Sequence, residues 1–506
     1  MKKNGYLFGP AILVLVLGFV LGACEKKGVA GGAGADPSRQ VELTCYIIGG
    51  PQPNSPEMEA YANRILAEKL PNTTLKYLYI DWGDLAQGKY ELLFSSGEVF
   101  DMCYAASWLG LSSLATRGAF MPLDDLFPAY APVNYARQSP TALRQATFNG
   151  RLYAVPSLEK TYTVSGLLYR EAGLNLPGWD GKMENFDDLE RYIRIVKAYN
   201  PGVTGIHAGN EGNASLMRLW MENQGLYSND TIGALWWFDP RAENPQVLFW
   251  ADHPSIPEFL GLIERLNHID AWSKTALSDP AHNRWEQGLI AINFGGFDHY
   301  RDWSIKYPHL GIRFLNMNRN VAYGTFTNNA LAIPNTSRNP ERALMFWDLA
   351  TNDEELWRAI YYGIEGRSYR IAEQDGEKQY ERIFDSNGET VYDFPTLWSI
   401  KTPQFDLPQL GAPPEITRQK AYYDTIIKDG EGAQKFQAFV LERDPTDITS
   451  MTVNNAHREL FGPLSLGFVD VRTGLANYRQ AMRVAGIEKV KQEIQKQLDA
   501  YLESLN

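Results

Sequence analysis

The sequence contains few residues that could bind a metal ion or form a disulfide framework. It has three cysteines and seven histidines in 506 residues, and no two histidines are four residues apart. The cysteines and histidines do not show the spacings of common zinc sites. Cys45 and Cys103 alone are too few for a disulfide scaffold. Both cysteines lie in apolar, strand-like runs, which favours two buried thiols, with a single bridge as the alternative. We therefore expect neither a metal nor a cofactor.

Basic residues and the common catalytic motifs are also scarce. Lysine and arginine number 48 against 60 acidic residues, a net charge of −12. This balance gives no basic excess with which to bind nucleic acid. The chain contains no G-x-S-x-G, H-E-x-x-H or P-loop run. Its N-terminal apolar run, residues 6–20, is shorter than the roughly 20 residues of a membrane-spanning helix.

The first residues carry an export signal. Lys2 and Lys3 precede the apolar run, which ends in Leu21-Gly22-Ala23-Cys24. This order resembles the bacterial lipobox and implies a signal peptide over 1–23 and a lipid anchor on Cys24. A single anchor helix with an incidental cysteine is the alternative. Residues 24–40 are rich in Gly and Ala and predict a flexible tether between membrane and folded body.

Alternating patterns along the body predict an α/β fold. Strand, helix, strand, helix and strand are expected in turn over 41–49, 55–66, 74–80, 84–95 and 100–105. This spacing is typical of a parallel sheet. Further helices are expected at 186–199, 214–223, 256–269, 339–350, 353–362 and 484–504, and further strands at 164–169, 289–294 and 329–333. A hairpin is expected over 235–250, whereas the periodicity of 370–410 is too weak to assign.

Several motifs together resemble the extracellular solute-binding proteins of carbohydrate-type ABC importers. They are SSGEVFDMCY (95–104), RGAFMPLDDL (117–126), FNGRLYAVP (148–156), QGLIAINFGG (287–296) and NPERALMFW (339–347). YIDWGDLAQGKYELL (79–93) and the C-terminal AGIEKVKQEIQKQLDAYL are similar to a longer lipoprotein subgroup with an extra C-terminal module. The sequence departs from many sugar binders at Phe297-Asp298, where an aromatic platform residue is common.

The resemblance implies a two-lobed periplasmic-binding-protein-like (Venus flytrap) fold with hinge strands between the lobes. On this basis, lobe 1 comprises 41–157 and about 296–335, and lobe 2 comprises 158–295 and about 336–430. Residues 431–506 form a C-terminal helical module. Of the thirteen tryptophans, seven fall between 220 and 303, a concentration that is also consistent with an aromatic core.

In such a fold the ligand lies between the lobes, at loops that follow the strands. Aromatic faces and polar side chains in these loops are therefore the candidate ligand-binding residues. They are Trp82, Trp108, Glu159, Lys160, Tyr162, Asp298, Tyr300 and Asn328. Acidic pairs such as Asp187-Asp188 are expected to be solvated or to lie at helix starts.

The predicted function is that of a monomeric, membrane-anchored receptor that delivers a small solute, a mono- or oligosaccharide, to the permease subunits of an ABC importer. It would lie on the periplasmic face or the cell surface. One alternative is an adhesin or structural lipoprotein on the same fold. The other is an exported glycan-active enzyme, which would need two carboxylates across a cleft.

Overall fold

The computed structural model describes residues 36–505 except 87, 209–211, 230, 279–284, 319, 375, 387, 389, 393–397, 429–432 and 443–446. The predicted signal peptide, Cys24 and most of the tether thus lie outside the described residues. Within the described part, no helix is long and apolar enough to cross a membrane. The same residues contain no cluster of three or more side chains suited to holding a metal ion.

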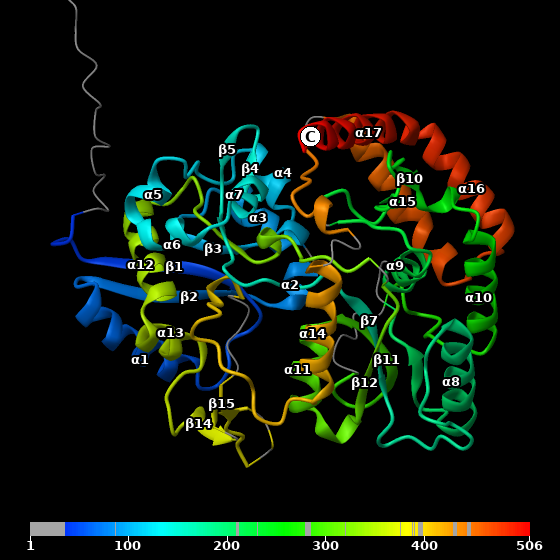
Figure 1. Ribbon diagram of the computed structural model, residues 1–506, viewed down its shortest axis with the longest axis horizontal. Coiled ribbons are helices and arrows are strands. Elements are labelled where there is room, and N and C mark those ends of the chain that lie inside the picture. The colour runs from blue at the N-terminus through cyan, green and yellow to red at the C-terminus, as the bar shows by residue number, and fades with distance from the viewer. Residues whose placement is uncertain are drawn as a thin grey trace, which may run out of the picture.

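The first lobe is built on a five-stranded sheet with the order β2-β1-β3-β13-β6. Figure 1 labels β1, β2 and β3 of this sheet. β1 pairs in parallel with β2 and β3, as the sequence predicts, and β13 then adds antiparallel to β3. The strands are β1 (Val41–Ile48), β2 (Thr73–Ile80), β3 (Met102–Ala105), β6 (Val155–Pro156) and β13 (Ala330–Ala332), with small ribbons β4 (Thr147–Phe148)–β5 (Arg151–Leu152) and β14 (Tyr369–Gln374)–β15 (Glu377–Arg382).

The helices of this lobe cover the sheet on both sides. They are α1 (Ser55–Lys69), α2 (Trp82–Ala86), α3 (Lys89–Ser95), α4 (Leu111–Thr116), α5 (Leu126–Tyr130), α6 (Pro132–Arg137), α7 (Pro140–Gln145), α12 (Pro340–Asn352) and α13 (Glu354–Tyr361). One helix was expected over 84–95, but α2 and α3 are separate because Gly88 adopts a left-handed conformation (φ 78°) between them.

The second lobe is built on a four-stranded sheet with the order β12-β7-β11-β8. Its strands are β7 (Ser165–Arg170), β8 (Thr204–Ile206), β11 (Ile290–Gly296) and β12 (Ile312–Asn316), with the predicted hairpin β9 (Trp236–Trp237)–β10 (Leu248–Phe249). Its helices are α8 (Phe186–Tyr199), α9 (Ala214–Asn223), α10 (Ile256–His268), α11 (Phe297–Lys306) and α14 (Glu415–Lys428). Successive β7 residues Leu167 and Leu168 enter different cores, because strand side chains alternate between the two faces of a sheet.

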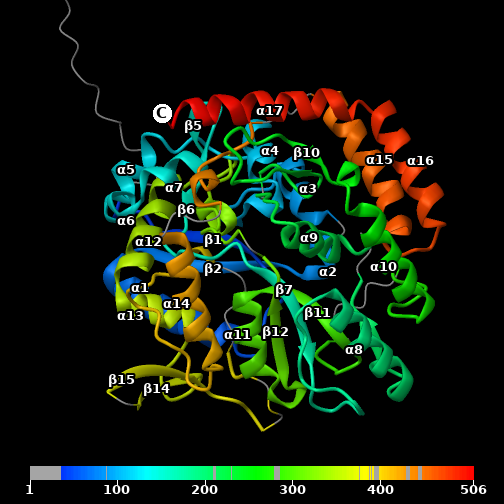
Figure 2. The same ribbon diagram turned by 45° about the vertical axis from the view of Figure 1, so that its right-hand side comes forward.

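The C-terminal helices α15 (Ile448–Ser465), α16 (Val471–Val484) and α17 (Ile487–Glu503) pack into the second-lobe core. The apolar stripe of α17 that the sequence predicts, including Ile487, Val490, Ile494 and Leu498, is buried there. In both views α17 lies along the top of the molecule, with its C-terminal end towards the first lobe (Figures 1 and 2).

Two segments pack differently from the predicted lobe assignment. Residues 296–316 were expected in lobe 1, but β12 pairs with β7 in the second-lobe sheet. Residues from 336 to about 400 were expected in lobe 2, but Trp347, Trp357 and Ile400 lie in the first-lobe core. Sequence order alone does not say which core an amphipathic helix joins, and α12 follows directly from β13 onto the first-lobe sheet.

The folded body also begins earlier than predicted. The buried Arg342 side chain donates a hydrogen bond to the carbonyl of Asp36, and Asn72 Nδ2 donates to Pro37 O at 3.1 Å. Residues 36–40, expected in the tether, therefore lie against lobe 1.

Cys45 and Cys103 are buried free thiols. Their strands are neighbours, but Cys45 is aligned with Met102 and Cys103 with Tyr46. Aligned residues in neighbouring strands point to the same face, so the two thiols point to opposite faces of the sheet. The prediction of two buried thiols is confirmed.

Candidate functional site

A group of three tryptophans, two of them exposed, lies at the edge of the first lobe that faces the second. Trp82 follows β2 and Trp108 follows β3, so both lie at the carboxyl ends of parallel strands. Their rings stack with centroids 6.3 Å apart and an interplanar angle of 19°, and Trp398 lies 6.4 Å from Trp82. Trp82 is 46% exposed and Trp108 41% exposed, which is unusual for such large apolar side chains. We call Trp82, Trp108 and Trp398 the aromatic platform.

The platform is held by the chain segment that crosses between the lobes. Trp108 Nε1 donates a hydrogen bond to Asn328 O at 3.1 Å. The buried Tyr104 hydroxyl donates to Asn329 Oδ1 at 2.7 Å, and its ring packs edge-on against Trp398 at 5.9 Å. Asn328, predicted to contact a ligand, thus orients Trp108 through its backbone carbonyl.

Helix α11 of the second lobe carries charged groups that face the first lobe. Arg301 bonds Asp302 Oδ1 at 2.9 Å and lies 3.3 Å from Asp298 Oδ1. The carboxylates of Asp298 and Asp302 are 42% and 39% exposed, whereas Arg301 is 19% exposed. The two acids thus remain accessible to a solute while Arg301 is fixed between them.

Lys401 and Glu159 complete the charged group from the first-lobe side. Lys401 is buried, its Nζ lies 3.5 Å from Glu159 Oε2, and its backbone N–H donates to Trp398 O at 3.1 Å. Burial raises the pKa of Glu159, although Lys401 opposes the shift. At Asp298, desolvation is outweighed by Lys401 and Arg301, which hold its pKa below the ordinary value. Lys401 of the first lobe therefore stabilises the charged form of Asp298 in the second lobe, which places these charges between the two lobes.

Tyr162 and Lys160 lie at the crossing itself. Tyr162 forms an isolated antiparallel bridge with Tyr323, so the two crossing strands run side by side. Both hydroxyls donate to Asp424 Oδ1 of α14, at 2.8 Å and 3.1 Å. Lys160 Nζ lies 5.2 Å from the centre of the Tyr323 ring. Burial and the Asp424 hydrogen bond raise the pKa of Tyr162. The contacts of Tyr162 in this structure are thus those of a hinge residue.

Three glutamines join the crossing strands to the start of the C-terminal module. Gln434 Oε1 accepts from Tyr323 N at 2.8 Å, and Gln437 Nε2 donates to Gly324 O at 2.9 Å. From the first lobe, the buried Gln145 accepts from Phe326 N at 2.7 Å and donates to Gln437 O. We call Gln145, Gln434 and Gln437 the hinge glutamines.

Tyr300 does not lie in the site that the other candidates form. It is 3% exposed and stacks on Phe314 at 5.4 Å, inside the core beneath the second sheet. Because α11 begins at Phe297, Tyr300 lies one turn later on the same inner face. The structure therefore removes Tyr300 from the candidate set.

Sequence analysis missed Trp398, Lys401 and Arg301. Trp398 and Lys401 fall in the segment whose weak periodicity left it unassigned. Arg301 had a usable signal, because it lies three residues after Asp298 on a helix and must share its face. Ligand contact remains a prediction for the other seven candidates, which are Trp82, Trp108, Glu159, Lys160, Tyr162, Asp298 and Asn328.

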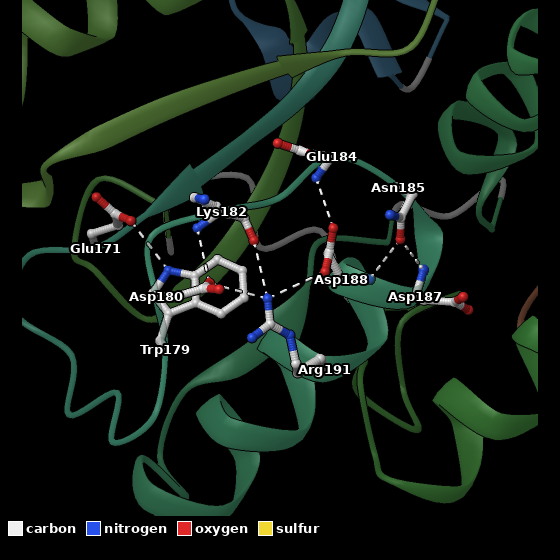
Figure 3. Close-up of polar contacts among 9 residues, drawn as sticks. All are labelled: Glu171, Trp179, Asp180, Lys182, Glu184, Asn185, Asp187, Asp188 and Arg191. Carbon is white, nitrogen blue, oxygen red and sulfur yellow. Dashed lines mark hydrogen bonds and ion pairs between the residues drawn. The ribbon is translucent and has the colours of Figure 1, made fainter.

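A second polar cluster, at the outer edge of the second lobe, has a structural explanation. Asn185 Oδ1 accepts from the N–H groups of Asp187 and Asp188 at 2.9 Å and 3.0 Å, and Asp188 accepts from Glu184 N (Figure 3). Arg191 bonds Asp188 and Asp180 and lies 4.8 Å over the Trp179 ring. These contacts cap α8 and close the preceding loop, which confirms the expectation for Asp187-Asp188.

Comparisons with known proteins agree with this architecture. A family model described as bacterial extracellular solute-binding protein matches residues 52–356, and a domain of unknown function (DUF3502) matches 435–503. A carbohydrate ABC transporter substrate-binding protein of Streptococcus pneumoniae serotype 4 is 22% identical, over 99% of this chain and 98% of its own.

Solved structures show the same fold. The N-glycan transport solute-binding protein NgtS of Streptococcus pneumoniae, in complex with Man5GlcNAc, superposes with a TM-score of 0.72 at 18% identity, over 92% of this chain and 99% of that one. The alginate-binding protein AlgQ2 superposes with a TM-score of 0.63 at 16% identity, over 93% and 100% of the two chains. The S. pneumoniae substrate-binding protein FusA in complex with kestose gives 0.58 at 14% identity, over 92% and 100%.

Proposed function

Because this chain belongs to the bacterial extracellular solute-binding protein family, we propose that it is the carbohydrate receptor of an ABC importer. The observation that carries the proposal is the aromatic platform, with Trp82 and Trp108 exposed. It lies beside the charged side chains of α11 from the second lobe and of Lys401 and Glu159 from the first. The names of its relatives support the same class of solute, since they include a carbohydrate transporter component and proteins bound to N-glycan fragments and kestose.

The interlobe groups suit a sugar chemically. A pyranose has apolar C–H faces that stack on indole rings, and hydroxyls that both donate and accept hydrogen bonds. Trp82 and Trp108 would supply the stacking surface. Asp298 would accept from sugar hydroxyls, and Arg301 would hold that carboxylate in place.

Closure of the two lobes would couple binding to transport. A ligand that contacts the platform and α11 together stabilises the arrangement in which the two surfaces are close. Tyr162, Tyr323 and Asp424 would serve as the pivot, because the Asp424 carboxylate accepts a hydrogen bond from one tyrosine of each crossing strand. Small-angle scattering should show a smaller radius of gyration with saturating ligand, and an unchanged radius would contradict closure.

We further propose that the protein is exported, anchored through a lipid on Cys24, and presents its ligand to the permease subunits as a monomer. The family description supports an extracellular location. Labelling with a radioactive fatty acid should mark the native chain and leave a Cys24→Ala variant unlabelled. Label on the variant would contradict this site of attachment.

A ligand screen tests the function directly. The chain from residue 25 onward would be screened by thermal shift against mannose-containing glycans, fructans, maltose-type oligosaccharides, amino acids and peptides. A ligand at 100 times its Kd should stabilise the protein by about 2.7 kcal/mol. Hits are then incubated with the protein and analysed by chromatography. A sugar that binds and is recovered unchanged supports a receptor, whereas a sugar that is converted supports the enzyme. The absence of a thermal shift with every sugar supports the adhesin.

A further inference from the structure

One face of α11 forms a stripe of three charged residues and one apolar residue toward the first lobe. Asp298, Arg301, Asp302 and Ile305 follow the spacing i, i+3, i+4 and i+7, which places them on the same side of a helix. The opposite side, with Phe297 and Tyr300, is buried. From Asp298 to Ile305 the stripe is about 10 Å long at 1.5 Å per residue.

The stripe faces first-lobe side chains along its whole length. At the N-terminal end of the stripe, Lys401 helps to lower the pKa of Asp298. Further along, desolvation of Asp302 is outweighed by Arg301 and by Arg382 of β15, which lower its pKa. The end of the stripe near the aromatic platform and the end near the β14–β15 ribbon therefore lie on one interlobe surface.

A cavity of about 370 Å³ lies at the far end of the stripe. Its volume is in the usual range for small-molecule sites, about 300–1,000 Å³. Ile305 lines it from the second lobe, and the other lining residues belong to the β14–β15 ribbon and the chain that follows. Those residues are Arg370, Glu381, Arg382, Ile383, Phe384, Leu410 and Gly411.

We propose that this cavity is a distal subsite that holds one ring of an oligosaccharide whose other end lies on the aromatic platform. The inference rests on the proposed function. It narrows the solute class to chains of several linked sugars, because the stripe between platform and cavity is longer than a single ring.

The cavity has the groups that such a ring requires. Phe384 is 40% exposed and offers an aromatic face. Arg370 Nε and Glu381 Oε2 are 2.7 Å apart, so a donor and an acceptor are already fixed side by side for sugar hydroxyls. These charges largely balance, and so do those of Asp302 and Arg382, which favours a neutral ring over an anionic one.

Two variants test the subsite in the chain from residue 25 onward. Phe384→Ala removes the aromatic face, and Ile305→Trp fills the cavity from α11. Tyr199→Ala is the matched control, because Tyr199 is an exposed aromatic at the outer end of α8. The probes for calorimetry are a short and a long member of two series: Man1GlcNAc and Man5GlcNAc, and maltose and maltopentaose.

The parent and the control should bind the long member of one series more tightly than the short one. Phe384→Ala and Ile305→Trp should lose that gain, about tenfold in Kd or 1.4 kcal/mol, while affinity for the short member stays unchanged. Long-chain affinity equal to the parent in both variants would overturn the subsite and leave the receptor function intact. If neither series binds the parent, the proposed function fails and the subsite with it.

Discussion

Tryptophans of this protein occur in two contrasting settings. Trp236, Trp237, Trp250 and Trp272 of the second lobe are at most 2% exposed and lie in the second-lobe core. Trp82 and Trp108 of the first lobe are nearly half exposed and stack on each other at the interlobe surface. The first group buries apolar area that stabilises the fold, whereas the second leaves such area in water, a cost that binding of a ligand would offset. Residue type alone therefore does not distinguish core from site.

The largest effect is expected for a core tryptophan. Trp250→Ala removes a fully buried ring that packs edge-on against Phe461 at 5.5 Å and donates to Tyr478 at 3.1 Å. The cavity and the lost contacts should lower the free energy of unfolding by about 3–5 kcal/mol. Denaturant titration of the parent and variant measures this. A loss as small as that of an exposed residue would break the contrast between the two settings.

The same aromatic core should make the protein sensitive to acid. His457 Nδ1 lies 2.7 Å from the Tyr478 hydroxyl, and burial lowers the His457 pKa from 6.5 to about 4. The unfolded chain thus takes up a proton between these pH values that the folded chain does not. This contribution to stability is present above pH 6.5 and is lost as pH falls towards 4, by up to about 3 kcal/mol.

Unfolding measured across this pH range in the parent and in a His457→Phe variant isolates the effect. The variant should lose less stability on acidification than the parent. Parallel pH profiles would show that His457 is not kept neutral by the core.

A platform tryptophan should behave in the opposite way to Trp250. Trp108→Ala removes an exposed stacking face, so we expect the affinity for a bound glycan to fall by about 1–3 kcal/mol. The melting temperature should stay close to that of the parent. Calorimetry and thermal unfolding on one preparation give both values. Unchanged affinity with a large loss of stability would place Trp108 with the core group.

The smallest effect is expected at a third tryptophan, at the outer edge of the second lobe. Arg191→Ala removes the guanidinium over Trp179 and its exposed ion pairs, without touching either core or platform. Exposed pairs of this kind contribute little. Both melting temperature and glycan affinity should remain near the parent values. A marked loss of affinity would extend the functional surface beyond the interlobe region.

The sequence predicted those parts of the fold that have local signals. α8 begins where Asn185 caps it, and α9 matches its expected range. The strand β11 was expected over 289–294, but the helix α11 that follows it was not predicted. The tryptophans between 220 and 303 are largely core residues, one of the two interpretations that their spacing allowed.

The remaining features depend on contacts between distant segments. The assignment of α12 and α13 to the first lobe, and the place of Lys401 beside Glu159, arise from packing across more than 200 residues of chain. Tyr300 and Asp298 are two residues apart, yet one is buried and the other faces the interlobe surface. Only the helix start at Phe297 decides between them.

The hinge glutamines bear on whether the C-terminal module can be treated as a separable unit. Gln434 immediately precedes the segment matched by the domain of unknown function, and Gln437 is the third residue of that segment. Both bond the crossing strand, at Tyr323 and Gly324. Deleting the chain from residue 434 would remove the partners of the Gly324 carbonyl and of the buried Gln145 amide. A buried amide left unpaired costs about 1–3 kcal/mol. The module is therefore not interchangeable with that of a relative unless the glutamines are carried along. A truncated protein that no longer binds would report a damaged pivot and an opened second-lobe core, even if the module never touches the solute.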